Sequence, residues 1–273
     1  MCHIMKRLLN KRTTKIVSSN SPLTFETTGG GSWEVWDRFI AVNGQNIYHI
    51  GNVCGTCSFF FEKLIDNKKS INPKETIDKL NVGLTFIDDN TIDILREIIP
   101  NGFYEIALLT ITPKFTVVGQ PNDYFAKEQV DLWGIDGYYG VPHSPKVNYY
   151  RGSDKEIGDD RKIFEFFIPL TSTENLDQKR VDFYKEEILK GNKPTAISLS
   201  TLDIKEPAVW PEDDIEPEFT SHWCIAHYIV DGHHKIKAAC DLNSEITLLS
   251  FIATEKGISS TDDINELLKH IDN

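Results

Sequence analysis

The sequence feature that most constrains the fold is an apolar run, a tight polar turn and a helical segment that follow one another without a gap. The run over 225–230 predicts a buried strand, and the apolar spacing over 236–242 predicts a helix. The turn between them, which we call the glycine box, reads Asp231, Gly232, His233, His234 and Lys235. Its glycine permits a sharp reversal, and the first amides of the helix face the turn without an intrahelical partner. The box therefore favours an anion, as a phosphate-handling site requires.

Composition limits the class of protein. The chain has 273 residues, of which 40% are hydrophobic and 26% charged, as is typical of a soluble protein with one or two domains. It contains no run of about 18 apolar residues, so we expect no membrane span. The basic start, Met1 to Leu9, lacks the apolar core of a secretory signal. With five cysteines and no such signal, we expect a cytoplasmic protein whose thiols are free.

The chain is expected to have two parts within an α/β or α+β fold. The stretch from about 119 to 160 is rich in Gly, Pro, Asp, Tyr and Asn, which indicates a joint between domains. We therefore expect an unassigned α+β domain with a mixed sheet over 1–155, followed by an α/β domain over 160–273.

A hairpin is the clearest element of the first part. Asn43 and Gly44 lie between two apolar runs, 39–42 and 47–50, and this dipeptide favours a two-residue turn. The other elements expected there are a flexible arm ending at glycines 29–31, helices over 72–99 that begin near Pro73, and a strand over 104–112. No Lys-Ser/Thr pair follows the glycine run, which argues against a phosphate loop.

The second part has a regular order of elements that resembles the ParB/sulfiredoxin-like domain over residues 162–254. The motifs that carry the resemblance are a first strand ending in Phe167-Ile168-Pro169-Leu170, a helix over 177–190 ending in Lys190-Gly191, a strand over 195–199 after Pro194, and the glycine box leading into its helix. A final strand over 246–251 and a terminal helix over 261–270 complete the part.

The resemblance implies that the box cradles the phosphates of a nucleotide such as ATP or ADP, with Mg²⁺. The family's sulfinic acid reductase carries a cysteine where this chain has His233. The family's partition protein carries a Glu-Arg-Arg box and a following DNA-binding domain, which we do not expect here. A kinase-like, a nuclease-like or a non-catalytic nucleotide-binding module remains.

Five residues are candidates for the chemistry. His233 or His234 would act as a general base or a phosphate ligand, because imidazole titrates near neutral pH. Lys235 would meet a phosphate as a point charge, beside the backbone of Gly232. Asp231 would hold Mg²⁺ or orient an imidazole. Glu174, just after the first strand of the part, would face the same mouth and deprotonate a substrate hydroxyl. The alternative is that these polar residues only cap helices.

Cys54 and Cys57 form the second candidate site. A Cys-x-x-Cys between a strand and a helix fits a thiol redox pair, and the same spacing supplies half of a zinc site. The phenylalanines at 59–61 are compatible with a helix start or with a strand. Additional zinc ligands would have to come from Cys2, His3 or His49, and no second Cys-x-x-Cys exists, so zinc is disfavoured. Two plain buried thiols are the third alternative.

The leading hypothesis is a protein that binds a nucleotide or another small phosphorylated ligand and that acts, if it is an enzyme, as a phosphotransferase or phosphodiesterase. The alternative is a non-catalytic interaction protein of the immunity or regulatory type, which an acidic surface would suit. The net charge of −12 opposes an extended nucleic-acid-binding surface. A thiol redox or zinc protein is the third hypothesis.

Overall fold

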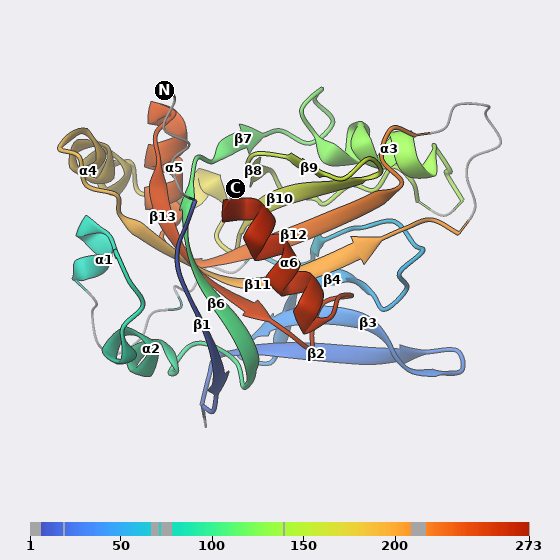
Figure 1. The fold of residues 1–273 in the computed structure, drawn as a ribbon, viewed down its shortest axis with the longest axis horizontal. Helices are drawn as coiled ribbons and strands as arrows, with labels where there is room; N and C mark the ends of the chain where they lie inside the picture. The colour runs from blue at the N-terminus through green and yellow to red at the C-terminus, as the bar shows by residue number, and fades with distance from the viewer. Residues whose placement is uncertain are drawn as a thin grey trace.

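Two β-sheets and the helices around them make up the fold (Figure 1). The structure is a computed structural model, and it describes residues 7–18, 20–66, 71, 78–138, 140–208 and 217–272. Over these residues the class is mixed α/β, as the sequence predicts.

The large sheet has the strand order β1-β6-β13-β11-β12-β10-β8-β7 within the described residues, and β9 pairs with β10 beside this row. Its strands are β1 (Leu8–Ile16), β6 (Gly102–Ile111), β7 (Lys114–Thr116), β8 (Tyr149–Arg151), β9 (Lys155–Ile157), β10 (Arg161–Pro169), β11 (Thr195–Lys205), β12 (Ser221–Asp231) and β13 (Ile246–Ala253). β10 runs parallel to β12, and β11 runs parallel to β13. The carboxyl ends of β10 and β12 therefore lie at the same edge of the sheet, at Pro169 and Asp231.

The small sheet is antiparallel and follows the chain order. Its strands are β2 (Leu23–Gly30), β3 (Trp33–Val42), β4 (Gln45–Asn52) and β5 (Glu62–Lys63). The helices are α1 (Lys79–Val82), α2 (Asp89–Leu95), η1 (Tyr124–Ala126), α3 (Glu128–Trp133), η2 (Thr173–Asn175), α4 (Gln178–Leu189), α5 (His233–Leu242) and α6 (Thr261–Asp272). Among the described residues, no helix combines the length and the apolar character that a bilayer crossing needs.

The large sheet is buried on both faces, and β12 shows how. Ile225 and Ile229 belong to one hydrophobic cluster, which includes residues of α4, α5 and α6. Ala226 and Tyr228, which point the other way, belong to a second cluster that includes Ile40 and other residues of the small sheet. Figure 1 shows α6 across one face of the large sheet, with the small sheet packed at its lower part.

A buried ion pair joins the two sheets. Arg38 of β3 donates to both carboxylate oxygens of Asp203 on β11, at 3.0 Å and 2.6 Å. The Arg38 guanidinium also donates to the carbonyl oxygens of Ile50 and Lys256, and Asp203 accepts from the Ile258 N–H. This guanidinium holds the pKa of the Asp203 carboxyl below its usual value, against the opposing effect of burial. The pair links β3 of the small sheet to β11 of the large sheet, and removal of either partner would leave the other charge buried and uncompensated.

Several sequence predictions are confirmed. Asn43 and Gly44 have positive φ angles of 51° and 76°, as the expected hairpin turn requires. The expected strands and helices of the second part are all present, in the expected order. α4 begins after Asp177, whose carboxylate accepts from the Lys179 N–H, and Gly191 follows its end with a φ of 92°.

Other predictions are wrong. The arm expected over the first 30 residues instead contains β1 and β2, and the glycine run ends β2 and enters the turn to β3 at Gly31. β1 pairs with β6, which lies far along the chain, so the local sequence gave no sign of it. Of the helical stretch expected over 72–99, the described residues contain only the short helices α1 and α2, and Pro73 lies outside the described residues. The phenylalanines at 59–61 form neither helix nor strand.

The large sheet spans the joint that the sequence indicates. β1, β6, β7 and β8 precede residue 155, and they lie in the same sheet as β10 to β13, which follow residue 160. The division into 1–155 and 160–273 as separate folding units stays a prediction.

Candidate functional site

The glycine box forms the sharp strand-to-helix turn that its sequence predicts. β12 ends at Asp231, Gly232 has a φ of 94°, and α5 begins at His233. A Cβ at residue 232 would lie 2.7 Å from the Ala196 Cβ and 2.8 Å from its Cα. Both the left-handed backbone and the close approach of β11 therefore require glycine at this position.

The two histidines of the box hold the loop that joins β10 to α4. The Thr171 N–H donates to His233 Nε2 at 3.1 Å, and the Asp177 N–H donates to His234 Nε2 at 3.2 Å. Burial lowers the pKa of His233 to about 4, and it also lowers the pKa of His234. Both rings are therefore uncharged at neutral pH, and each Nε2 lone pair is free to accept. Their assignment as general bases stays a prediction.

Lys235 points into the protein from the first turn of α5. Its side chain is 4% exposed, and its Nζ donates to the Thr195 carbonyl oxygen at 2.8 Å. The ammonium lies 3.7 Å from the Asp231 carboxylate and 5.5 Å from the centre of the Tyr184 ring. Burial lowers the pKa of Lys235. Lys235 thus links α5 to β11 through a hydrogen bond. The Asp231 carboxylate lies near the Lys235 ammonium.

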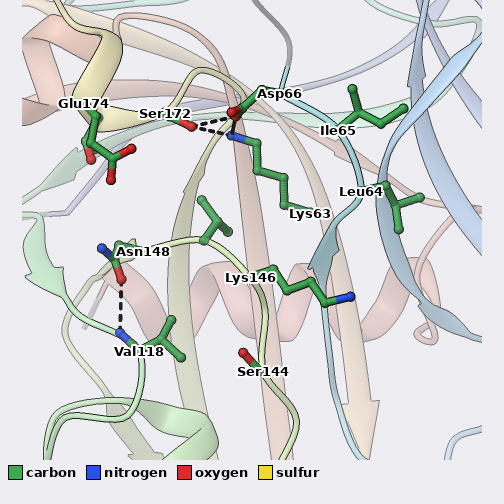
Figure 2. Close-up of a pocket in the computed structure, with 12 residues that line it drawn as sticks. Lys63, Leu64, Ile65, Asp66, Val118, Ser144, Lys146, Asn148, Ser172 and Glu174 are labelled. Atoms are coloured by element: carbon green, nitrogen blue, oxygen red, sulfur yellow. Dashed lines mark hydrogen bonds and ion pairs between the residues drawn. The ribbon is translucent and has the colours of Figure 1, made fainter.

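An open cavity of about 410 Å³ lies beside the loop that the histidines hold. We call it the carboxyl-end cavity, because Ser172 to Glu174, just past the end of β10, form one wall (Figure 2). Its other lining residues include Lys63, Leu64, Asp66, Val118, Ser144, Lys146 and Asn148. Lysines, hydroxyls and a carboxylate therefore meet at one opening.

A hydrogen-bonded cluster forms the inner wall of this cavity. Lys63 is 8% exposed, and its Nζ donates to Ser172 Oγ at 2.6 Å. The Ser172 hydroxyl donates to Asp66 Oδ1 at 2.7 Å, and Lys63 forms an ion pair with the same carboxylate. Figure 2 shows the three side chains pointing toward one another, with Glu174 nearby. The ammonium is thereby fixed at the cavity wall.

The structure places Glu174 and His233 in different surroundings, although the sequence predicts that they face one site. Glu174 is exposed on η2 and lines the carboxyl-end cavity. His233 lines a narrow void with Thr171, Thr173 and Leu176 that has no room for a water molecule. His233 therefore contacts the inner side of the loop between β10 and α4. The same loop places Glu174 at the opening of the carboxyl-end cavity.

Sequence reasoning missed Lys63, Asp66 and Ser172. Ser172 could have been predicted as a site residue, because loops at the carboxyl ends of parallel strands are frequent ligand sites. Lys63 and Asp66 lie more than 100 residues earlier in the chain, and nothing in the local sequence connects them with that loop.

Cys54 and Cys57 are joined in a disulfide bond, so the expectation of free thiols is wrong for this pair. Cys224 and Cys240 are free. Both disulfide cysteines are partly exposed, and the Lys205 Nζ donates to the Cys54 carbonyl oxygen at 2.6 Å. The segment after Cys57 is not helical, so no helix terminus is present to lower a thiol pKa. In the part of the chain that the structure describes, no three metal-binding side chains come together.

Comparisons with protein-family models, with curated proteins and with solved structures find no match for this chain. The likeness to the ParB/sulfiredoxin-like domain stays an interpretation of residues 162–254. The element order that this likeness implies, which is β10, α4, β11, β12, α5 and β13, is the order in the structure.

Proposed function

We propose that the protein binds a nucleotide or another small phosphorylated ligand in the carboxyl-end cavity. The observation that carries this proposal is the Lys63–Ser172 pair at the wall of an open cavity, on a loop held by the glycine box. Loops at the carboxyl ends of parallel strands are frequent ligand sites in sheets of this kind. The family resemblance points to the same edge of the sheet.

The chemistry of the wall suits phosphate. Lys63 supplies an ammonium that is already desolvated and oriented, which lowers the cost of binding an anion there. The hydroxyls of Ser144 and Thr173 are donors for phosphate oxygens, and the Ser172 hydroxyl holds the Lys63 ammonium in place. Lys146 adds a second ammonium, which is 65% exposed and paired with Glu62. A ligand phosphate would compete with Asp66 for the Lys63 ammonium.

The glycine box contributes by positioning in this proposal. His233 and His234 fix the two ends of the loop at Thr171 and Asp177, and Glu174 lies between these points. If the bound nucleotide is a phosphoryl donor, a substrate hydroxyl would attack its terminal phosphorus, and the bond from that phosphorus to the nucleoside diphosphate would break. Glu174, which lines the cavity and is exposed, would accept the hydroxyl proton.

Calorimetric titration tests the proposal. The wild-type protein should bind at least one of ATP, ADP, CTP or GTP, with or without Mg²⁺. Lys63→Met should weaken that binding about tenfold or more, because it removes a charge-assisted hydrogen bond worth about 1.5–3 kcal/mol. Lys179→Met is the control, since Lys179 is exposed on α4 and does not line the cavity. No heat with any of the four nucleotides would remove the proposal.

Ser172→Ala keeps the test decisive if Lys63→Met does not fold. Ser172 is only half-buried, so its replacement should leave the melting temperature within a few degrees. It should still weaken nucleotide binding severalfold. Unchanged affinity in a folded Ser172→Ala protein would show that the nucleotide binds elsewhere.

A further inference from the structure

A second and larger cavity lies at the opposite ends of β10 and β12. It has a volume of about 630 Å³, and Lys162 and His222, near the first residues of these two strands, line it. We call it the amino-end cavity. Pro169 lies seven positions after Lys162 on β10, which is about 23 Å in an extended strand. The cavity is therefore distinct from the carboxyl-end cavity, and its volume is in the range of small-molecule sites.

The walls of the amino-end cavity are mostly apolar. Val130, Leu132 and Ile135 come from α3 and the residues after it, and Phe164 and Phe219 face them from β10 and the segment before β12. Ile135 is 77% exposed, so its side chain is open to contact with a ligand. A flat apolar group would cover these side chains and remove them from water.

Two lysines of this cavity have no carboxylate partner among the described residues. The Lys162 ammonium lies 4.9 Å from the centre of the Phe219 ring and 5.6 Å from that of Phe164. Lys127 is exposed at the rim. Of the carboxylates at the rim, Glu128 is paired with Arg151 at 2.9 Å, whereas Asp131 and Glu218 are exposed to solvent. Lys162 is therefore the cation that an anionic ligand would meet against the aromatic wall.

A buried hydrogen-bond relay fixes His222 at the floor of this cavity. The Cys224 thiol donates to the Tyr124 oxygen at 3.7 Å, and the Tyr124 hydroxyl is hydrogen-bonded to His222 Nδ1 at 2.9 Å. In the tautomer in which Nδ1 accepts from the Tyr124 hydroxyl, the ring proton lies on Nε2. Nε2 has no hydrogen-bond partner in the described part of the chain, although the residue is only 3% exposed. A ligand acceptor in the cavity would satisfy this donor.

We propose that the amino-end cavity binds a small organic anion with a flat apolar body. The apolar body packs between Phe219 and the α3 side, and the anionic group meets the Lys162 ammonium. The exposed carboxylates at the rim favour a single negative charge over two or more. This site does not depend on the carboxyl-end cavity, so either proposal stands if the other fails.

Two fluorescent dyes of similar shape test the proposal. The probe is 8-anilinonaphthalene-1-sulfonate, which carries one negative charge, and its neutral counterpart is N-phenyl-1-naphthylamine. Both should bind the folded wild-type protein. Lys162→Gln should weaken sulfonate binding about fivefold or more and change binding of the neutral dye less than twofold. Phe219→Ala should weaken binding of both dyes.

Lys179→Gln is the matched control, because it removes an exposed lysine remote from this cavity, and it should change neither affinity. Circular dichroism melting shows that each variant is folded. The proposal is overturned if neither dye binds the native protein, or if Phe219→Ala leaves both affinities unchanged. It is also overturned if Lys162→Gln affects the two dyes equally.

Discussion

The two ends of the β10–β12 strand pair differ in how they use histidine and lysine. At the carboxyl end, Nε2 of His233 and Nε2 of His234 each accept a hydrogen bond from a backbone N–H. Lys63 there is hydrogen-bonded to Ser172 and paired with Asp66. At the amino end, Tyr124 takes only Nδ1 of His222, and Lys162 lies over aromatic rings without a carboxylate partner among the described residues. The same pair of strands thus presents a polar, internally satisfied opening at one end and an apolar opening with unused donors at the other.

This difference shows that the presence of a histidine says little about its role. The box histidines stand in a motif that suggests catalysis, yet their contacts hold a loop. His222 stands in no motif, yet its Nε2 has no hydrogen-bond partner among the described residues. The box histidines and His222 differ in which ring nitrogens already have a hydrogen-bond partner.

Acid should destabilise both ends, and it should destabilise the amino end more. Burial lowers the pKa of His222 to about 3 and that of His233 to about 4, against about 6.5 in the unfolded chain. As pH falls below 6.5, the unfolded chain binds these protons first, so the free energy of unfolding decreases until the folded rings protonate. At 1.36 kcal/mol for each pKa unit, the loss by pH 3 is at most about 5 kcal/mol from His222 and about 3 kcal/mol from His233.

Urea unfolding at pH 7, 5 and 3 measures this loss. His222→Gln should remove a larger part of the acid dependence than His233→Gln. Equal pH dependence in the wild type and in both variants would mean that neither ring is held uncharged by burial.

The sequence predicts the fold well where one segment contains the whole signal. The hairpin at Asn43 and Gly44, the box and the helix after Asp177 are each set by local backbone preference and capping. Edge strand β1 and the contact of Lys63 with Ser172 depend on partners about 100 residues away, which no local pattern reveals. The contacts of His233 and His234 with the loop could not be predicted for a related reason. Their partners are backbone N–H groups, which every residue except proline has, so the sequence does not mark them.

Breaking the Arg38–Asp203 ion pair tests how much this buried pair contributes to the free energy of unfolding. Asp203 pairs with Cys224 across β11 and β12, and its carboxylate is 2% exposed. Asp203→Asn should lower the free energy of unfolding by about 3–5 kcal/mol, because it leaves the Arg38 charge buried without a partner. Asp89→Asn, which breaks the exposed pair with Arg12, should cost less than about 1 kcal/mol. Similar losses in urea unfolding would contradict a special role for the buried pair.

Replacing Gly232 tests how much the tight turn at the carboxyl end contributes to the free energy of unfolding. Gly232→Ala should cost about 2–3 kcal/mol, because it combines a left-handed φ with a Cβ clash against Ala196. Gly191→Ala has nearly the same φ, 92°, and no atom within 4 Å of its Cβ, so it should cost only about 1 kcal/mol. The difference in urea midpoint between the two variants isolates the packing contribution, and equal midpoints would exclude it.

The central claim is that the carboxyl end of this strand pair takes a phosphorylated ligand and that the amino end does not. Titration of the tightest-binding nucleotide among ATP, ADP, CTP and GTP into two variants, Lys63→Met and Lys162→Met, tests it most directly. Lys63→Met should lose about tenfold or more in affinity, while Lys162→Met should stay within twofold of the wild type. An equal loss in both variants, or a loss only in Lys162→Met, would contradict the claim.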